Sequence, residues 1–169
     1  MKLNNQLFIT NNPITSDWVN LSEFSLSMDI DDFNILDFFN SDHYKNDFLN
    51  QVLKNSNNDL HLEPMFIGNK LKMSKFKIFN YTELISFLKN YMSDIEVWGE
   101  DFNSNFLKIY NKVYNYFDCI NIFYVLDKED FNEEDEEVSN DFILYDYYLL
   151  ILGVDTSNRK LFTFEWASD

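Results

Sequence analysis

The stretch that decides the fold is Asp141–Trp166, which reads DFILYDYYLLILGVDTSNRKLFTFEW. Its first arm, residues 142–154, is apolar at both odd and even positions, a pattern typical of a strand that is covered on both faces. The return arm, residues 160–166, alternates an aromatic face with a face formed by Leu161, Thr163 and Glu165, which predicts a half-buried strand. Residues 155–158 between the arms have turn chemistry but no Asn-Gly pair, so we expect a hairpin loop of four or five residues.

A third apolar run precedes this hairpin. Residues 119–126 have the pattern of a buried strand, and the short connections predict an antiparallel meander made of strands near 119–126, 142–154 and 160–166. Further strands are expected over residues 7–10 and 23–30.

About four helices are expected in addition, beginning at caps in Asp31 or Asp32, Ser41, Thr82 and Ser104. Residues 60–79 predict another hairpin, with its turn at Gly68-Asn69 and a bulge at Ser74-Lys75. Because the strands cluster as hairpins rather than alternate with helices, the pattern favours the α+β class over a doubly wound α/β fold.

The composition predicts one globular domain over residues 1–169. The chain is 46% hydrophobic and 18% aromatic, which is enough apolar material for a core of this size. The surplus of tyrosine and tryptophan has two interpretations: exposed anchors for a protein partner, or tyrosine standing in for phenylalanine at the margin of the core. Twelve lysines against a single arginine are typical of AT-rich coding DNA, which suggests a bacterial or phage origin.

Compartment and covalent chemistry are constrained by a few absences. Cys119 is the one cysteine, so no internal disulfide can form, which fits a reducing cytoplasm. The first residues lack the apolar run of a secretory signal, and no stretch has the roughly 20 apolar residues of a membrane span. We therefore expect a cytoplasmic protein.

The net charge of −16 at pH 7 narrows the choice of partners. Phosphate backbones and anionic membranes would be repelled, so direct binding of nucleic acid or of such a membrane is not expected. An acidic surface favours basic partners and speeds their encounter, although acidity can also serve solubility alone.

Half of this charge lies in residues 127–141, which hold nine acids and one base, Lys128, for a net −8. Packed like charges resist ordering, so we expect a mobile loop that Phe131 and Val138 attach to the body. Three interpretations compete: a solvated loop, an anionic docking surface, and a calcium site. The glycine that a calcium loop needs for its sharp turn is missing, so a dedicated cation site is not supported.

One basic stripe, Lys70, Lys72, Lys75 and Lys77, stands out in this acidic chain. It is either a solvated face that deters edge-to-edge strand pairing or an attachment point for an acidic patch, within the chain or on a partner.

The residues offer no catalytic constellation. The three glycines stand alone, so a phosphate cradle is not expected, and His43 and His61 belong to no metal-spaced cluster. Cys119 adjoins apolar residues, which raise the pKa of a thiol rather than lower it. We expect no cofactor, no metal and no enzymatic activity.

These points lead to the hypothesis of an acidic inhibitor, in particular an immunity protein that masks the active or nucleic-acid-binding cleft of a basic, nuclease-like bacterial toxin. The hypothesis rests on charge and composition and on no family motif. Alternatives are a phage-encoded inhibitor that imitates the charge of DNA, and an enzyme or structural subunit whose site is not visible in sequence. The expected partner-binding residues are Asp127, Glu129, Asp130, Glu133, Glu134, Asp135, Glu136, Glu137, Asp141, Tyr145 and Trp98.

Overall fold

The structure is a computed structural model of the chain. It describes residues 2–12, 17–26, 34–45, 64–95, 107, 110, 111, 114, 117, 118, 120–141 and 146–168.

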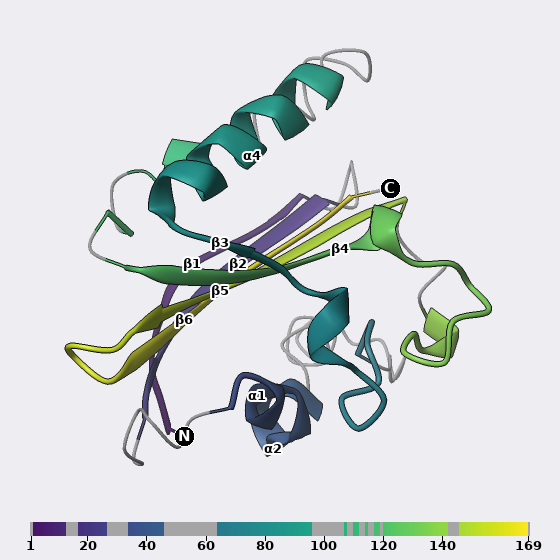
Figure 1. Cartoon of the computed structure of the whole chain (residues 1–169), viewed down its shortest axis with the longest axis horizontal. Helices are drawn as coiled ribbons and strands as arrows, with labels where there is room; N and C mark the ends of the chain where they lie inside the picture. Colours follow the sequence, from purple (N-terminus) through teal and green to yellow (C-terminus); the bar gives the residue numbers. More distant parts are fainter. Residues whose placement is uncertain are drawn as a thin grey trace.

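Six antiparallel strands form one sheet in the order β1-β2-β6-β5-β4-β3 (Figure 1). Their bounds are β1 Lys2–Asn12, β2 Asp17–Ser25, β3 Lys77–Phe79, β4 Ile122–Asp127, β5 Tyr147–Asp155 and β6 Lys160–Ser168. The C-terminal hairpin β5–β6 lies in the middle of this order, between β2 and β4. The sheet therefore brings the first strand of the chain and the last into one structure.

Helical segments lie on both sides of the sheet. The α-helices of the described residues are α1 Leu36–Asn40, α2 Asp42–Lys45 and α4 Tyr81–Ile95, and two short 3-10 turns are η2 Met73–Lys75 and η3 Lys128–Asp130. Figure 1 shows α4 above the sheet, with α1 and α2 below it. None of the helices in these described segments is long and apolar enough to cross a bilayer.

Each face of the sheet has its own apolar layer. On the α4 side, Leu84 and Leu88 belong to the same buried cluster as Ile151 and Trp166 of the central strands. On the other side, the cluster joins the opposite face of β5 to residues of α1, α2, the 64–71 segment and the 131–138 segment. Two covered faces require a central strand that is apolar throughout, and this explains the uninterrupted run at 147–154.

The predicted α+β class and the C-terminal meander are confirmed. Strand β4 pairs with β5, and β5 pairs with β6, each in antiparallel register. Residues 156–159 make the four-residue loop between β5 and β6, with Arg159 in a left-handed conformation at φ 53°. The part of the predicted strand at 142–145 lies outside the described residues.

The prediction that β6 is half-buried is wrong. Thr163 is 1% exposed and Glu165 is 6% exposed, so the more polar face of β6 is buried as well. The Glu165 carboxylate is hydrogen-bonded on both oxygens, accepting from the Tyr148 hydroxyl at 2.7 Å and from the Asn20 amide at 3.2 Å. Ser22 extends this network by donating to the Asn20 side-chain oxygen at 3.1 Å. A buried carboxylate is tolerated here because its lone pairs have partners.

The predicted hairpin at 60–79 is also wrong, as far as residues 64–79 show. Its two arms do not pair with each other: Phe66 forms an isolated bridge with Val138, and β3 pairs with β4. The turn after Ile67 is present, closed by the Lys70 N–H on the Ile67 carbonyl at 2.9 Å. Where we expected a bulge, the 3-10 turn η2 redirects the chain towards the edge of the sheet.

The predictions of the helices and of the N-terminal strands agree with the structure in part. The helix expected after Thr82 is confirmed as α4. About four helices were expected and three are described; α1 and α2 are short, with five and four residues, and most of the helix expected after Ser104 lies outside the described residues. Residues 7–10 fall within β1, and the strand expected over 23–30 begins earlier, at Asp17.

The buried Glu165 carboxylate gives a pH-dependent prediction. Burial raises the pKa of Glu165, and the hydrogen bonds from Tyr148 and Asn20 offset this only in part. The native state therefore holds this proton more tightly than the unfolded chain does. Its contribution to the free energy of unfolding is full below the ordinary glutamate pKa of 4.5 and is lost as pH rises through the raised native value.

Glu165→Gln removes this titration and keeps an oxygen that can accept from Tyr148. The unfolding free energy of the variant minus that of the wild type should increase as pH rises above 4.5, by at most about 1.4 kcal/mol per pH unit. Urea unfolding at a series of pH values measures the difference. A difference that is constant with pH would show that Glu165 titrates alike in both states.

Candidate protein-binding site

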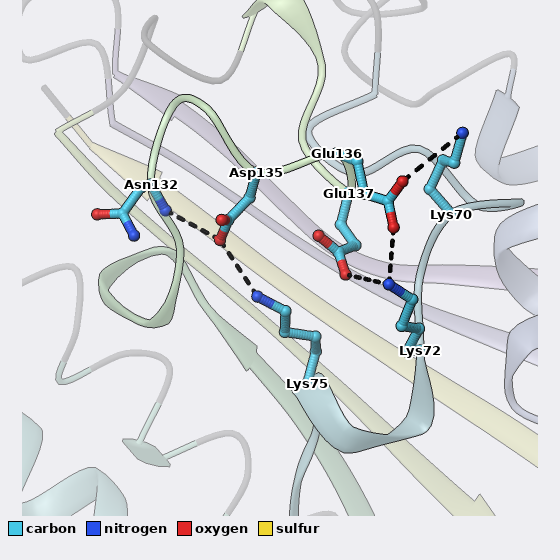
Figure 2. Close-up of polar contacts among 7 residues, drawn as sticks. All are labelled: Lys70, Lys72, Lys75, Asn132, Asp135, Glu136 and Glu137. Atoms are coloured by element: carbon cyan, nitrogen blue, oxygen red, sulfur yellow. Dashed lines mark hydrogen bonds and ion pairs between the residues drawn. The ribbon is translucent and has the colours of Figure 1, made fainter.

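The lysine stripe and the acidic segment pair with each other (Figure 2). The Lys72 ammonium lies 2.7 Å from a Glu136 carboxylate oxygen and 3.5 Å from Glu137, and Lys75 lies 3.2 Å from Asp135. Lys70 makes a longer pair with Glu136, at 3.8 Å. Of the two interpretations of the stripe, attachment to an acidic patch within the chain is the one observed.

Backbone hydrogen bonds set the position of the acidic segment. The Ile67 N–H donates to the Glu137 carbonyl at 2.7 Å, and the Ser139 N–H donates to the Met65 carbonyl at 3.0 Å, on either side of the Phe66–Val138 bridge. Phe131 and Val138 are each 7% exposed, so both attach the segment to the core as predicted. These contacts place residues 135–137 opposite the lysines that follow Gly68.

A second pairing site lies where β4 ends. Lys77 of β3 reaches Asp130 at 2.7 Å and Asp127 at 3.3 Å, and Asp127 also accepts from the Glu129 N–H at 3.2 Å. The Asp127 side chain is 3% exposed, whereas Lys77 is 34% exposed and keeps part of its hydration. Burial raises the pKa of Asp127, with Lys77 lowering it only in part. Burial lowers the pKa of Lys77, but its hydrogen bond to Asp130 and the charge of Asp127 outweigh this and raise it.

The pairs that Lys70 and Lys72 make with Glu136 in Figure 2 are much more exposed, whereas Lys75 and Asp135 are partly buried. A hydrogen bond from the Asn132 N–H, then that from Lys75, holds the pKa of Asp135 below its ordinary value, and Lys72 does the same for Glu136. The Lys72 and Glu136 side chains are 59% and 55% exposed. Exposed pairs of this kind contribute at most about 1 kcal/mol each, so a cationic partner can compete with them.

A subset of the acids is left without such compensation. In the described part of the chain, the side chains of Glu129, Glu133, Glu134 and Asp146 are exposed and make no ion pair. Adding the four lysines of the stripe to residues 127–141 changes their net charge from −8 to −4. The segment therefore keeps an excess negative charge after its internal pairs are formed. We call these four residues the unpaired acids.

Tyr147, an aromatic residue that the sequence did not single out, directly follows one of these acids, Asp146. Tyr147, the first residue of β5, is half-buried and stacks on Trp166 with ring centroids 6.2 Å apart. Burial raises the pKa of Tyr147, and the negative charges of Asp146 and Glu129 raise it further. Tyr147 belongs to a sequence of closely spaced tyrosines, Tyr145, Tyr147 and Tyr148. The prediction named only Tyr145 of these as a partner-binding residue.

The other predicted site residues are distributed as follows. Asp141 is partly buried, and its N–H donates to the Ser139 hydroxyl at 3.3 Å. Tyr145 and Trp98 lie outside the described residues. The mobility of residues 127–141 stays a prediction, although the lysines now supply part of the countercharge whose absence was the reason for it.

His43 packs against the rings of Phe24 and Phe38, and burial lowers the pKa of its imidazole. No group of three or more potential ligands that could hold a metal ion occurs in the described ranges. His61 and Cys119 fall outside those ranges.

Comparison with protein-family models, with curated proteins and with solved structures gave no match to this chain.

Proposed function

We propose that this chain is a cytoplasmic inhibitor that binds a strongly basic protein, and that its partner is a nuclease-like toxin whose cationic cleft it masks. The observation that carries the proposal is the set of unpaired acids in the segment between β4 and β5, with Tyr147 directly after Asp146 at the start of β5. The lysine stripe forms its ion pairs with other carboxylates, so it does not neutralise the charge of these four acids.

Binding would combine long-range steering with short-range contact. The excess negative charge attracts a cationic surface during diffusion and raises the rate of encounter. On contact, Tyr147 supplies a rigid aromatic surface, and the carboxylates of Glu129 and Asp146, whose charges act on Tyr147, can accept hydrogen bonds from an arginine or lysine of the partner. Such an aromatic residue with a charged rim is the usual composition of an energetically dominant interface residue and its surroundings.

The acids that pair with the lysine stripe give the partner a second set of carboxylates to bind. The partner's cations can replace Lys70 or Lys72 at Glu136, because these pairs are exposed and individually weak. Exchange of one cation for another conserves the number of ion pairs, so the acidic segment can pass from internal to intermolecular pairing at small electrostatic cost.

Co-purification from the source cells at low salt tests the proposal. We expect one basic protein in near-equal amount, released at about 0.5 M salt because screening shortens the range of the attraction, and inhibited when the chain is added back. The quadruple variant Glu129→Gln/Glu133→Gln/Glu134→Gln/Asp146→Asn should not retain it. An acidic partner, or a partner that the quadruple variant retains at full level, would overturn the proposal. Displacement of several unrelated DNA-binding proteins from duplex DNA would instead indicate a DNA mimic.

A further inference from the structure

A pocket of about 410 Å³ lies between α1, α2 and the segment that follows Pro64. Its walls are largely apolar and aromatic and include Phe39, Tyr44, Phe66 and Ile67. The volume falls in the range of small-molecule sites, about 300–1,000 Å³. It can hold one ring with a short chain.

Rigid contacts shape this pocket. The Tyr44 hydroxyl accepts from the Phe66 N–H at 3.1 Å, which ties α2 to the opposite wall. A Cβ atom on Gly68 would lie 2.3 Å from the Phe39 carbonyl oxygen, so only glycine allows these two backbones to approach this closely. The separation of the walls is therefore fixed by backbone contact as well as by side chains.

The polar groups at the pocket are one cation and several neutral side chains. Lys45 is exposed and forms no ion pair with any described residue, and it is the one charged side chain among the described residues that line the pocket. Asn40, Asn69 and Ser139 add neutral donors. Asp42, one turn earlier on α2, is not part of the lining. In a chain of net charge −16, a ligand with a negative group finds a local cation here and an apolar cavity beneath it.

We infer that this pocket binds a small organic monoanion: an aromatic or branched aliphatic body in the cavity, and a carboxylate or similar group on Lys45 and the neighbouring amides. The ligand is distinct in charge from the basic partner proposed above, and the site shares no residue with the unpaired acids. The inference therefore stands or fails independently of the proposed function.

Three matched probes test the charge preference: 3-phenylpropionate, 3-phenylpropanol and 3-phenylpropylamine, titrated into the ¹⁵N-labelled chain. We expect the carboxylate to shift the amide signals of Asn40, Lys45 and Asn69 with a Kd in the millimolar range or tighter. The amine should bind at least about 10-fold more weakly, as one desolvated ion pair allows.

Two variants then assign the site. Lys45→Gln should bind the carboxylate and the alcohol equally, because it loses only the charge, and Ile67→Trp should bind neither, because the indole fills the cavity. Both positions are exposed, so the midpoint temperature of thermal unfolding should stay close to that of the wild type. Shifts confined to residues outside the pocket, equal binding of the amine, or undiminished carboxylate binding by Lys45→Gln would overturn the inference.

Discussion

Replacing Lys77 by methionine is expected to lower the free energy of unfolding by about 3 kcal/mol, because it leaves a buried carboxylate without its countercharge. Asp127 is 2% exposed, and its carboxylate lies 3.3 Å from the Lys77 ammonium. Methionine keeps the length of the side chain and its contact with the Phe87 ring, over which Lys77 now lies at 5.2 Å. Urea unfolding at pH 7 measures the change.

Two companion variants separate the buried charge from other effects. Lys77→Met/Asp127→Asn should recover most of the loss, because asparagine removes the unpaired charge and can still accept from the Glu129 N–H. Lys70→Met changes the net charge equally, but its pair with Glu136 is long and exposed, so it should cost no more than about 0.5 kcal/mol. Equal losses from Lys77→Met and Lys70→Met would show that Asp127 does not depend on its lysine.

Neutralising two of the unpaired acids is expected to slow association with the basic partner about 5-fold at low salt, because steering depends on the charge nearest the contact. The variant is Glu133→Gln/Glu134→Gln, at two exposed residues of a turn with no ion pair among the described residues. Stopped-flow or surface-based kinetics at about 20 mM and 500 mM salt measures the association rate, and the difference should disappear at the higher salt.

The matched control for this variant is Asp37→Asn/Asp118→Asn. It removes the same charge from exposed sites on α1 and near the start of α4, away from the unpaired acids. Its association rate should change less than about 2-fold. If the control slows association as much as the test variant does, net charge rather than its location drives encounter, and the proposed face has no special role.

The central meander was predictable because its information is local. The apolar run of β5, the four-residue loop and the alternating β6 lie within 30 residues, and periodicity together with turn chemistry determines how they pair. The burial of Glu165 was not predictable in this way. A charged residue in an alternating strand indicates a solvent-facing side unless partners such as Tyr148 and Asn20 can be seen to converge on it, and Asn20 is 145 positions away.

The wrong prediction of a hairpin at residues 60–79 also arises from contacts between residues far apart in the sequence. The turn after Ile67 was recognised, but a turn does not determine which strand each arm joins, and both arms pair with segments more than 40 positions later in the chain. The lysine stripe and the acidic segment were both visible as charge patterns. Their hydrogen bonds join residues 50 to 64 positions apart, so the pairing that leaves only some acids unpaired could be read only from the structure.

Hydrogen exchange of the chain, free and bound to its basic partner, tests most directly the claim that the unpaired acids and Tyr147 form the docking face. The amides of residues 127–137 and of 146–148 should exchange more slowly in the complex, while β1 at the far edge of the sheet should be unchanged. Protection confined to β1, or to the pocket beside Lys45, with none in residues 127–148, would contradict the account.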